Sequence, residues 1–191
     1  MNRKLQLLMA AAGTAAVGII VYKQVSRRKY SGIKLKRSVI IDKSAAELYR
    51  YWRNFRNLTV LVDALDSVDV IDNQRSRWTI TTPGGLNVSW DAEITTDREN
   101  EMIGWRSVDG STIETAGYIK FLQAPGGRGT LVRIALEYYP PAGGIGAGLS
   151  SLLGKRPGGI VEEALRRFKQ LHEAGAIARK ENRREHTVMV S

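Results

Sequence analysis

The chain has 191 residues, 43% of them hydrophobic, which is enough for one packed domain with additional segments. It contains no cysteine, which excludes disulfide frameworks, thiolate metal sites and cysteine nucleophiles. Its two histidines, His172 and His186, both lie near the C-terminus. We therefore expect no metal site, no histidine-centred catalytic triad and no cofactor in the main domain.

The formal net charge of +10 is unevenly distributed along the chain. Residues 1–37 contain nine basic residues and no acidic one, and the tail 176–191 contains four basic and two acidic residues. Residues 38–175 therefore carry a net charge of −1. A nearly neutral domain lacks the basic surface with which proteins bind a phosphate backbone. We expect no nucleic-acid partner.

Residues 5–22 form an uncharged stretch, LQLLMAAAGTAAVGIIVY. A helix of this length spans about 27 Å, close to the hydrocarbon core of a bilayer at roughly 30 Å. Tyr22 lies at its end, where an interfacial aromatic residue is expected. We predict a transmembrane anchor over residues 1–22. A cleaved signal peptide and a buried N-terminal helix are the alternatives.

Basic residues flank the predicted span on both sides, and more of them follow it than precede it. By the positive-inside rule, the chain is a single-pass membrane protein with its main domain in the cytoplasm. Residues 23–34 are then a basic juxtamembrane linker, and each basic residue near the bilayer contributes about 1 kcal/mol of attraction to anionic headgroups. The predicted headgroup contacts are Arg27, Arg28, Lys29, Lys34, Lys36 and Arg37.

The domain begins with a short β-branched strand at 37–42, which is followed by a helix starting at Ser44. Ser44 and Glu47 match a capping box. The next residues, LYRYWRNFRNL, place apolar side chains on one helical face and arginines on another. This spacing predicts a helix that buries its rings and exposes its arginines, with a second short helix over 54–61. The apolar face comprises Leu48, Trp52 and Phe55, and the basic face comprises Arg50, Arg53 and Arg56.

Further segments of the chain have strand character and are separated by turn signals. The clearest is 86–95, in which Leu86, Val88, Trp90, Ala92 and Ile94 alternate with polar residues. Because no helices separate the segments, we expect an antiparallel meander. The predicted strands are 67–72, 76–82, 86–95, 101–107, 112–122 and 131–139.

A long helix follows the glycine-rich stretch 140–159. Its apolar stripe contains Ile160, Ala164, Phe168 and Leu171, and Gly175 is placed to end it. The tail 176–191 is charged, and we predict that it is flexible. A strongly curved sheet covered by this helix would bury every apolar face and leave space for a ligand cavity.

This order of elements resembles the START-like superfamily, also called SRPBCC. Within it, the chain is similar to the polyketide cyclase/dehydrase and coenzyme Q-binding branch, in the membrane-associated cyclase/dehydrase subgroup. The resemblance covers most of residues 35–177. It depends on ELYRYWRNFRNL (47–58), DSVDVIDNQRSRWTI (66–80), VSWDAEITTDRENEMIGWRS (88–107), APGGRGTLVRIALEYYPPAG (124–143) and LRRFKQLHEAGAI (165–177).

The resemblance implies an α+β helix-grip fold over residues 35–175, in which a curved antiparallel sheet of about seven strands wraps around the long C-terminal helix. It also implies a hydrophobic cavity for lipids, isoprenoid quinones or polyketides. It does not imply one reaction, because many members only bind or carry. Residues 59–62 depart from the family pattern, which has a proline and bulkier residues near the pocket entrance.

Core and cavity wall share one face of the sheet in this fold. The aromatic and apolar residues predicted for that face are therefore our candidate ligand contacts. They are Trp52, Phe55, Trp78, Trp90, Trp105, Phe121, Ile134, Tyr138 and Phe168.

The glycine-rich stretch contains an apolar stripe formed by Ile145, Leu149, Leu152 and Leu153. It predicts either a gate over the cavity or a patch that touches the bilayer, and an ordinary connector is the alternative. The glycines themselves do not indicate a nucleotide loop, because no βαβ unit surrounds them.

No catalytic set emerges from the sequence. Asp91 and Glu93 share the polar face of 86–95, opposite Trp90, so we expect them to point to solvent. Our leading hypothesis is a membrane-anchored, non-catalytic domain that binds a hydrophobic small molecule. The alternatives are a polyketide cyclase/dehydrase-type enzyme and a membrane-tethered interaction protein without a ligand. Nothing in the sequence indicates an oligomeric state.

Overall fold

The computed structural model describes residues 32–82, 85–139 and 158–188, and the side chains of these as far as residue 174. Within this part of the chain, no helix is both long and apolar enough to cross a bilayer. The predicted span over 5–22 lies outside the described residues. The elements are β1 (Ile33–Ile41), α2 (Ala45–Arg53), η1 (Phe55–Asn57), α3 (Leu58–Leu61), β2 (Leu65–Val70), β3 (Arg75–Thr81), β4 (Asn87–Arg98), β5 (Met102–Ser107), β6 (Glu114–Gln123), η2 (Pro125–Gly127), β7 (Thr130–Tyr139) and α5 (Gly159–Val188).

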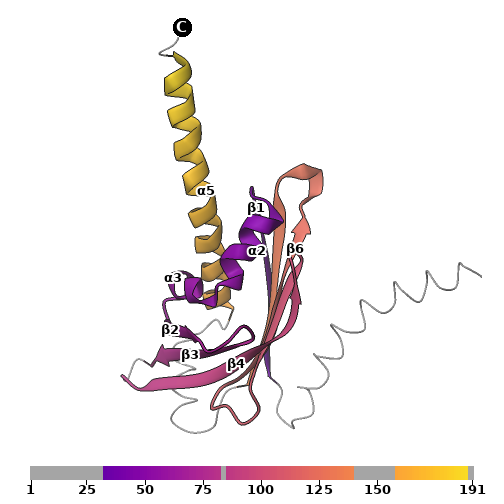
Figure 1. Cartoon of the computed structure of the whole chain (residues 1–191), viewed down its shortest axis with the longest axis vertical. Helices are drawn as coiled ribbons and strands as arrows, with labels where there is room; N and C mark the ends of the chain where they lie inside the picture. Colours follow the sequence, from indigo (N-terminus) through magenta and orange to yellow (C-terminus); the bar gives the residue numbers. More distant parts are fainter. Residues whose placement is uncertain (1–31, 83–84, 140–157, 189–191) are drawn as a thin grey trace, which may run out of the picture. The chain divides into compact units, whose positions relative to one another are not determined.

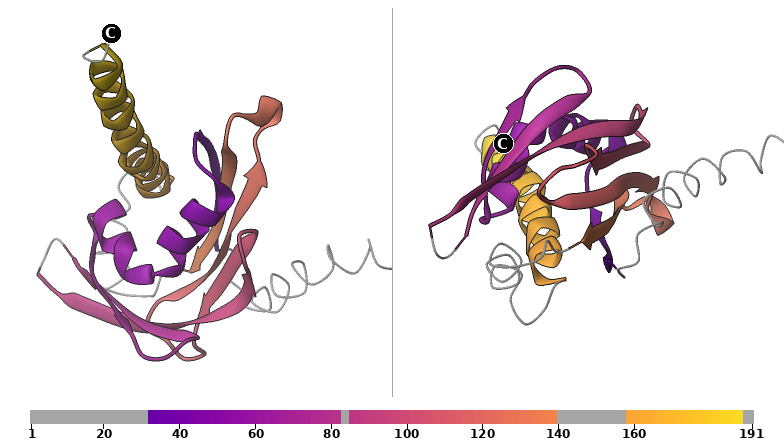
Figure 2. Two further views of the ribbon diagram at one scale, coloured as in Figure 1. Left: turned by 45° about the horizontal axis from the view of Figure 1, so that its top comes forward. Right: turned by 90° about the horizontal axis from the view of Figure 1, so that it is seen from below.

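The seven strands form one antiparallel sheet in the order β1-β7-β6-β5-β4-β3-β2. From β2 to β7, each strand pairs with its neighbours along the chain, and β1 closes the order by pairing with β7. Register shifts occur between Leu65 and Ser67 and between Ile94 and Thr96, and such irregularities bend a sheet. The sheet curves around the helices, which lie on its inner side (Figures 1 and 2). The predicted helix-grip arrangement of sheet and C-terminal helix is confirmed.

The start of α2 shows one of the two hydrogen bonds of the predicted capping box, the one accepted by Ser44. The Ser44 hydroxyl accepts a hydrogen bond from the backbone N–H of Glu47 at 3.2 Å, while the Glu47 carboxylate lies 3.4 Å from the Lys43 ammonium. Leu48 and Trp52 are buried, and Arg50 is exposed. The aromatic and basic stretch therefore packs its rings into the core, as predicted, and exposes Arg50 and Arg56, whereas Arg53 is half-buried and pairs with Asp97 at 2.7 Å.

Helix α5 packs along β1 and inside the curved sheet. Phe168 is completely buried and contacts the Trp52 ring edge-on at 5.4 Å between centroids. Lys169 donates to the backbone carbonyl of Ile40 at 2.7 Å, and the Glu173 carboxylate accepts from the N–H of Asp42 at 3.0 Å. These bonds fix the helix beside β1.

Three details of the sequence prediction are wrong. Leu171, predicted on the apolar stripe of the C-terminal helix, is 48% exposed. Leu86 is 52% exposed, because it precedes β4 and takes no part in the strand ladder. The helix does not end at Gly175 but continues to Val188. A glycine costs a helix only about 1 kcal/mol, and the residues after Gly175 include good helix formers such as alanine, arginine and lysine. The flexibility of the tail stays a prediction.

Candidate ligand-binding cavity

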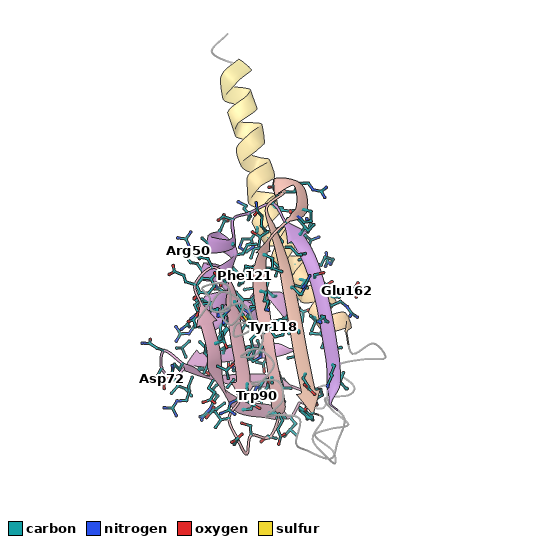
Figure 3. All side chains as sticks on the ribbon, turned by 90° about the vertical axis from the view of Figure 1, so that its right-hand side faces the viewer. Arg50, Asp72, Trp90, Tyr118, Phe121 and Glu162 are labelled. Carbon is teal, nitrogen blue, oxygen red and sulfur yellow. The ribbon has the colours of Figure 1, made fainter. Side chains whose placement is uncertain are left out.

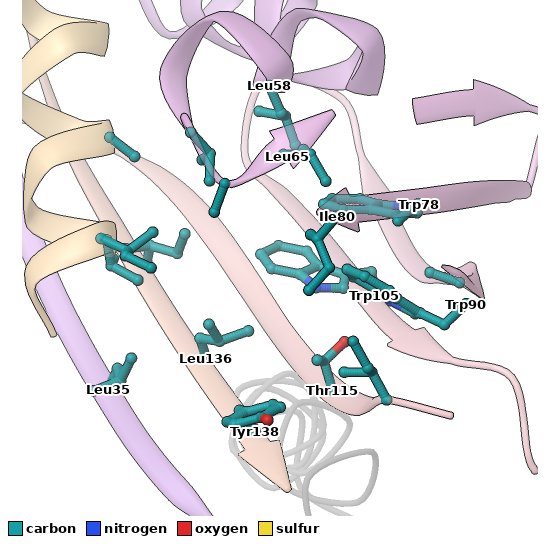
Figure 4. A pocket seen from close by; sticks show the side chains of 18 of the residues that line it. Leu35, Leu58, Leu65, Trp78, Ile80, Trp90, Trp105, Thr115, Leu136 and Tyr138 are labelled. Atoms are coloured by element: carbon teal, nitrogen blue, oxygen red, sulfur yellow. The ribbon is translucent and has the colours of Figure 1, made fainter. Parts of the chain in front are cut away.

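A cavity of about 210 Å³ lies between the inner face of the sheet and the helices α3 and α5. Only two of the described lining residues, Thr115 and Tyr138, bear a hydroxyl group, and none is charged. Figure 4 shows most of the lining side chains. They are Ile33, Leu35, Trp52, Leu58, Val62, Ala64, Leu65, Trp78, Ile80, Trp90, Ala92, Trp105, Ile113, Thr115, Ile134, Leu136, Tyr138, Ile160, Val161, Ala164 and Leu165.

All four tryptophans of the chain line the cavity. Trp78 and Trp90 are directly opposite each other on β3 and β4, with ring centroids 6.0 Å apart. Trp105 of β5 lies against Gly117 of β6, its direct partner in the sheet. A Cβ atom at Gly117 would lie 2.8 Å from the Trp105 ring and 2.7 Å from the carbonyl of Ala135. The glycine therefore lets the indole lie flat against the neighbouring strand.

The roof of the cavity comes from two segments joined by one ion pair, Arg167–Asp63. Helix α5 contributes Ile160, Val161, Ala164 and Leu165, and the region of α3 and β2 contributes Leu58, Val62, Ala64 and Leu65. The Arg167 guanidinium donates two hydrogen bonds to the Asp63 carboxylate, one of them at 2.6 Å, and also pairs with Glu163. This pairing connects the two halves of the roof at the surface.

Among the residues that the structure describes, two buried polar atoms of the cavity lining find no hydrogen-bond partner: the Tyr138 hydroxyl and the Trp52 indole Nε1. Tyr138 is 7% exposed and Trp52 4%. Burial raises the pKa of Tyr138 to about 12, so its hydroxyl stays protonated at neutral pH. Because buried polar groups are nearly always satisfied, both atoms are candidate donors to a ligand.

The structure brings six of the nine candidate contacts together around the cavity. They are Trp52, Trp78, Trp90, Trp105, Ile134 and Tyr138. The three phenylalanines do not line it. Phe55 packs against Trp78, Phe121 against Tyr49, and Phe168 against Trp52. Phe55 and Phe168 therefore pack behind lining tryptophans, whereas Phe121 contacts a residue outside the lining.

The predicted headgroup contacts and the predicted gate residues do not line the described cavity. Lys34 lies 3.6 Å from the Glu137 carboxylate, Arg37 lies 3.7 Å from that of Glu162, and Lys36 is exposed. The predicted gate residues Ile145, Leu149, Leu152 and Leu153 lie outside the described residues, as do Arg27, Arg28 and Lys29.

The sequence interpretation missed most of the aliphatic lining. Ile33 and Leu35 precede the predicted strand start, although their alternation with Lys34 and Lys36 is a strand signal that could have placed them. Ala64 lies in the short connection between α3 and β2, and Leu65 is the first residue of β2, before the predicted strand start at residue 67.

The described side chains do not form a recognisable acid–base pair inside the cavity. Asp91 pairs with Arg77 at 2.7 Å and Glu93 with Arg106 at 2.6 Å, all on the outer face of the sheet. His172 is buried elsewhere, against Tyr51 and Phe168. No group of potential metal ligands occurs among the described residues. The cavity is equipped to enclose an apolar molecule.

A family model described as polyketide cyclase / dehydrase and lipid transport matches residues 41–169. The chain belongs to this family. The polyketide cyclase/dehydrase branch of the START-like superfamily, indicated by the sequence, is thereby confirmed.

Solved structures agree with this family membership. A protein of Deinococcus radiodurans is 37% identical, with a TM-score of 0.62, over 75% of this chain and 99% of that one. The Zhui aromatase/cyclase of Streptomyces sp. R1128 is 11% identical, with a TM-score of 0.55, over 73% of this chain and 94% of that one. A START superfamily protein of Mycobacterium smegmatis is 16% identical, with a TM-score of 0.51, over 72% of this chain and 98% of that one. The last two share the fold alone.

Proposed function

We propose that this family member is a membrane-anchored domain that binds a hydrophobic small molecule and does not catalyse a reaction. The observation that carries the proposal is the cavity between sheet and helices, whose described lining is uncharged and almost entirely apolar. An apolar cavity of this kind gains affinity by removing apolar ligand surface from water.

The size and polarity of the cavity narrow the ligand class. Apolar cavities of about 150 Å³ bind benzene, whereas sites for whole drug-sized ligands measure about 300–1,000 Å³. The cavity of about 210 Å³ therefore suits a ring system, or one segment of a longer lipid or isoprenoid chain. The indole Nε1 of Trp52 only donates hydrogen bonds, so a polar atom of the ligand beside it must be an acceptor. A quinone or polyketide-like carbonyl meets this requirement.

Membrane anchoring is supported by the sequence around the domain. The uncharged stretch 5–22 is long enough to span a bilayer, and a run of basic residues follows it. An anchor of this kind would keep the cavity near the lipid phase in which such ligands dissolve. The domain would then face the cytoplasm.

Intrinsic fluorescence tests ligand binding directly, because all four tryptophans line the cavity. Titration with a short-chain prenyl benzoquinone, a quencher of indole fluorescence, should give saturable quenching. Ala164→Phe fills the cavity from α5 and should abolish the saturable quenching. Leu171→Phe, on the same helix at a position 48% exposed, is the matched control and should leave it intact. Equal quenching of the two variants would contradict the proposal.

The second candidate is a cyclase/dehydrase-type enzyme, favoured by one arrangement. Thr115 and Tyr138 are direct cross-strand partners on β6 and β7, and both line the cavity. Turnover of a polyketide-like substrate that is lost in both Tyr138→Phe and Thr115→Val would replace our proposal with this one.

A further inference from the structure

The arginines on the outer face of β3, β4 and β5 have acidic partners. Arg77 pairs with Asp91 across β3 and β4, and Arg106 pairs with Glu93 across β4 and β5. This half of the outer face is therefore locally neutral.

The other half of the outer face, on β6, β7 and β1, is different. Four basic side chains here and at the end of β4 make no ion pair within the described part of the chain. They are Lys36, Arg98, Lys120 and Arg133, and we call them the basic face. Figure 3 looks onto this side of the sheet, with Tyr118 near its middle.

The strand register places these residues in two adjacent rows across the sheet. In one row, Arg133 lies between Ser38 and Lys120, and Met102 lies between Lys120 and Arg98. In the other row, Lys36 is followed by Ala135, Tyr118, Gly104 and Thr96. Neither row contains a carboxylate.

This arrangement is unfavourable for the isolated domain. Lys120 and Arg133 are directly opposite each other, and like charges in that position destabilise a sheet. The nearest acidic residues do not compensate: Glu99 and Glu101 lie at the β4–β5 turn without an ion pair to the basic face, and Glu137 in the next row lies beside Lys34. Lys120 has only the Tyr118 ring, 5.3 Å from its ammonium. An external anion would relieve this repulsion.

We propose that the basic face docks on an anionic lipid bilayer. Strand β1 begins at Ile33, only the segment 23–32 separates it from the uncharged stretch 5–22, and Lys36 continues the basic run of that segment into the sheet. Two of the headgroup contacts predicted from the sequence, Lys34 and Arg37, lie beside carboxylates. In our proposal, Arg98, Lys120 and Arg133 contact the headgroups in their place. The inference rests on the proposed membrane association but not on the cavity ligand.

The absence of cysteine from the chain allows a specific test. An environment-sensitive dye is attached to Ser38→Cys, in the row of Arg133, and the full-length chain is reconstituted into vesicles. The vesicles consist of phosphatidylcholine, alone or mixed with phosphatidylglycerol, and carry a lipid-bound quencher. A dye on Ser89→Cys, an exposed residue on the neutral half of the outer face, is the positional control.

We expect the dye at position 38 to be quenched in the anionic vesicles only, and we expect salt to suppress this quenching. Each basic residue removed should weaken the docking equilibrium about fivefold. K120Q/R133Q should lose it. R50Q/R56Q removes two basic residues of α2 and η1 that form no ion pair with any described residue, and this variant should retain the quenching. Equal quenching in both vesicle types, or an effect of both double variants alike, would overturn the inference.

Two further measurements separate the related outcomes. Flotation of the vesicles at high salt reports the predicted span, because docking through charges is screened there. Flotation at high salt without quenching at position 38 refutes the basic face and leaves the anchor intact. Loss of double-stranded DNA binding in K120Q/R133Q, with vesicle docking unchanged, would assign the surface to nucleic acid instead.

Discussion

Gly117 determines how closely Trp105 approaches the sheet. The cavity wall needs an indole that lies against β6, and only a residue without a side chain leaves room for it. The same argument applies on the helix side, where Ala164 leaves space that a larger residue would fill. The cavity therefore depends on small residues as much as on large ones.

Gly117→Ala should lower the free energy of unfolding by about 1–3 kcal/mol, because its Cβ would collide with the Ala135 carbonyl and the Trp105 ring. Urea unfolding followed by tryptophan fluorescence measures this. Gly159→Ala, whose Cβ would meet nothing within 4 Å, is the control and should not destabilise the chain. An equal effect of the two substitutions would contradict the packing argument.

Tyr138 should make stability depend on pH in the alkaline range. Burial raises its pKa from 10.0 to about 12, so the folded state favours the neutral phenol. This contribution is complete below pH 10 and is lost as the pH rises towards 12. Between pH 10 and pH 12, the free energy of unfolding of Tyr138→Phe should therefore fall by about 2 kcal/mol less than that of the unaltered chain. Parallel pH profiles of the two proteins in urea unfolding would exclude this role of burial.

At the scale of elements, the Arg167–Asp63 ion pair, which joins α5 to the segment after α3, is the clearest candidate for control of access to the cavity. The Arg167 guanidinium holds the pKa of Asp63 below its usual value, and Arg166 and Arg167 lower the pKa of Glu163 to about 2. Both carboxylates therefore stay ionised at neutral pH. The pairing is lost only as the pH falls through these lowered pKa values.

Asp63→Asn should accelerate ligand exchange a few-fold while changing stability little, because the pair is exposed to solvent but joins two parts of the roof. Stopped-flow fluorescence of the cavity tryptophans measures the dissociation rate. Asp91→Asn removes an ion pair of similar geometry on the outer face and should not change that rate. An unchanged rate in Asp63→Asn would show that the ligand does not pass between α3 and α5.

The elements could be predicted from the sequence more fully than the cavity. Strong periodicity located β4 and α2, and the Ser44 cap fixed where α2 starts. The alternating pattern also identified the inner face of the sheet. It could not separate core from cavity wall, because both lie on that face. Phe168, one turn beyond Ala164, packs against Trp52 and so supports the wall instead of lining it.

The whole molecule combines a domain of this family with two proposed membrane contacts, the anchor and the basic face. The cavity is apolar and the net charge of residues 38–175 is close to zero. Four basic residues that make no ion pair within the described part of the chain, namely Lys36, Arg98, Lys120 and Arg133, lie on one side of the sheet. The proposed anchor and basic face would hold the domain against the bilayer in a defined orientation. Its ligand would then pass between the lipid phase and the protein with little exposure to water.

Native mass spectrometry of the full-length chain released gently from membranes tests the central claim most directly. We predict one non-covalent adduct of a hydrophobic molecule per chain, which Ala164→Phe loses and Leu171→Phe retains. Spectra that repeatedly show the bare chain, or an adduct that survives Ala164→Phe in a correctly folded protein, would contradict a ligand bound in the cavity.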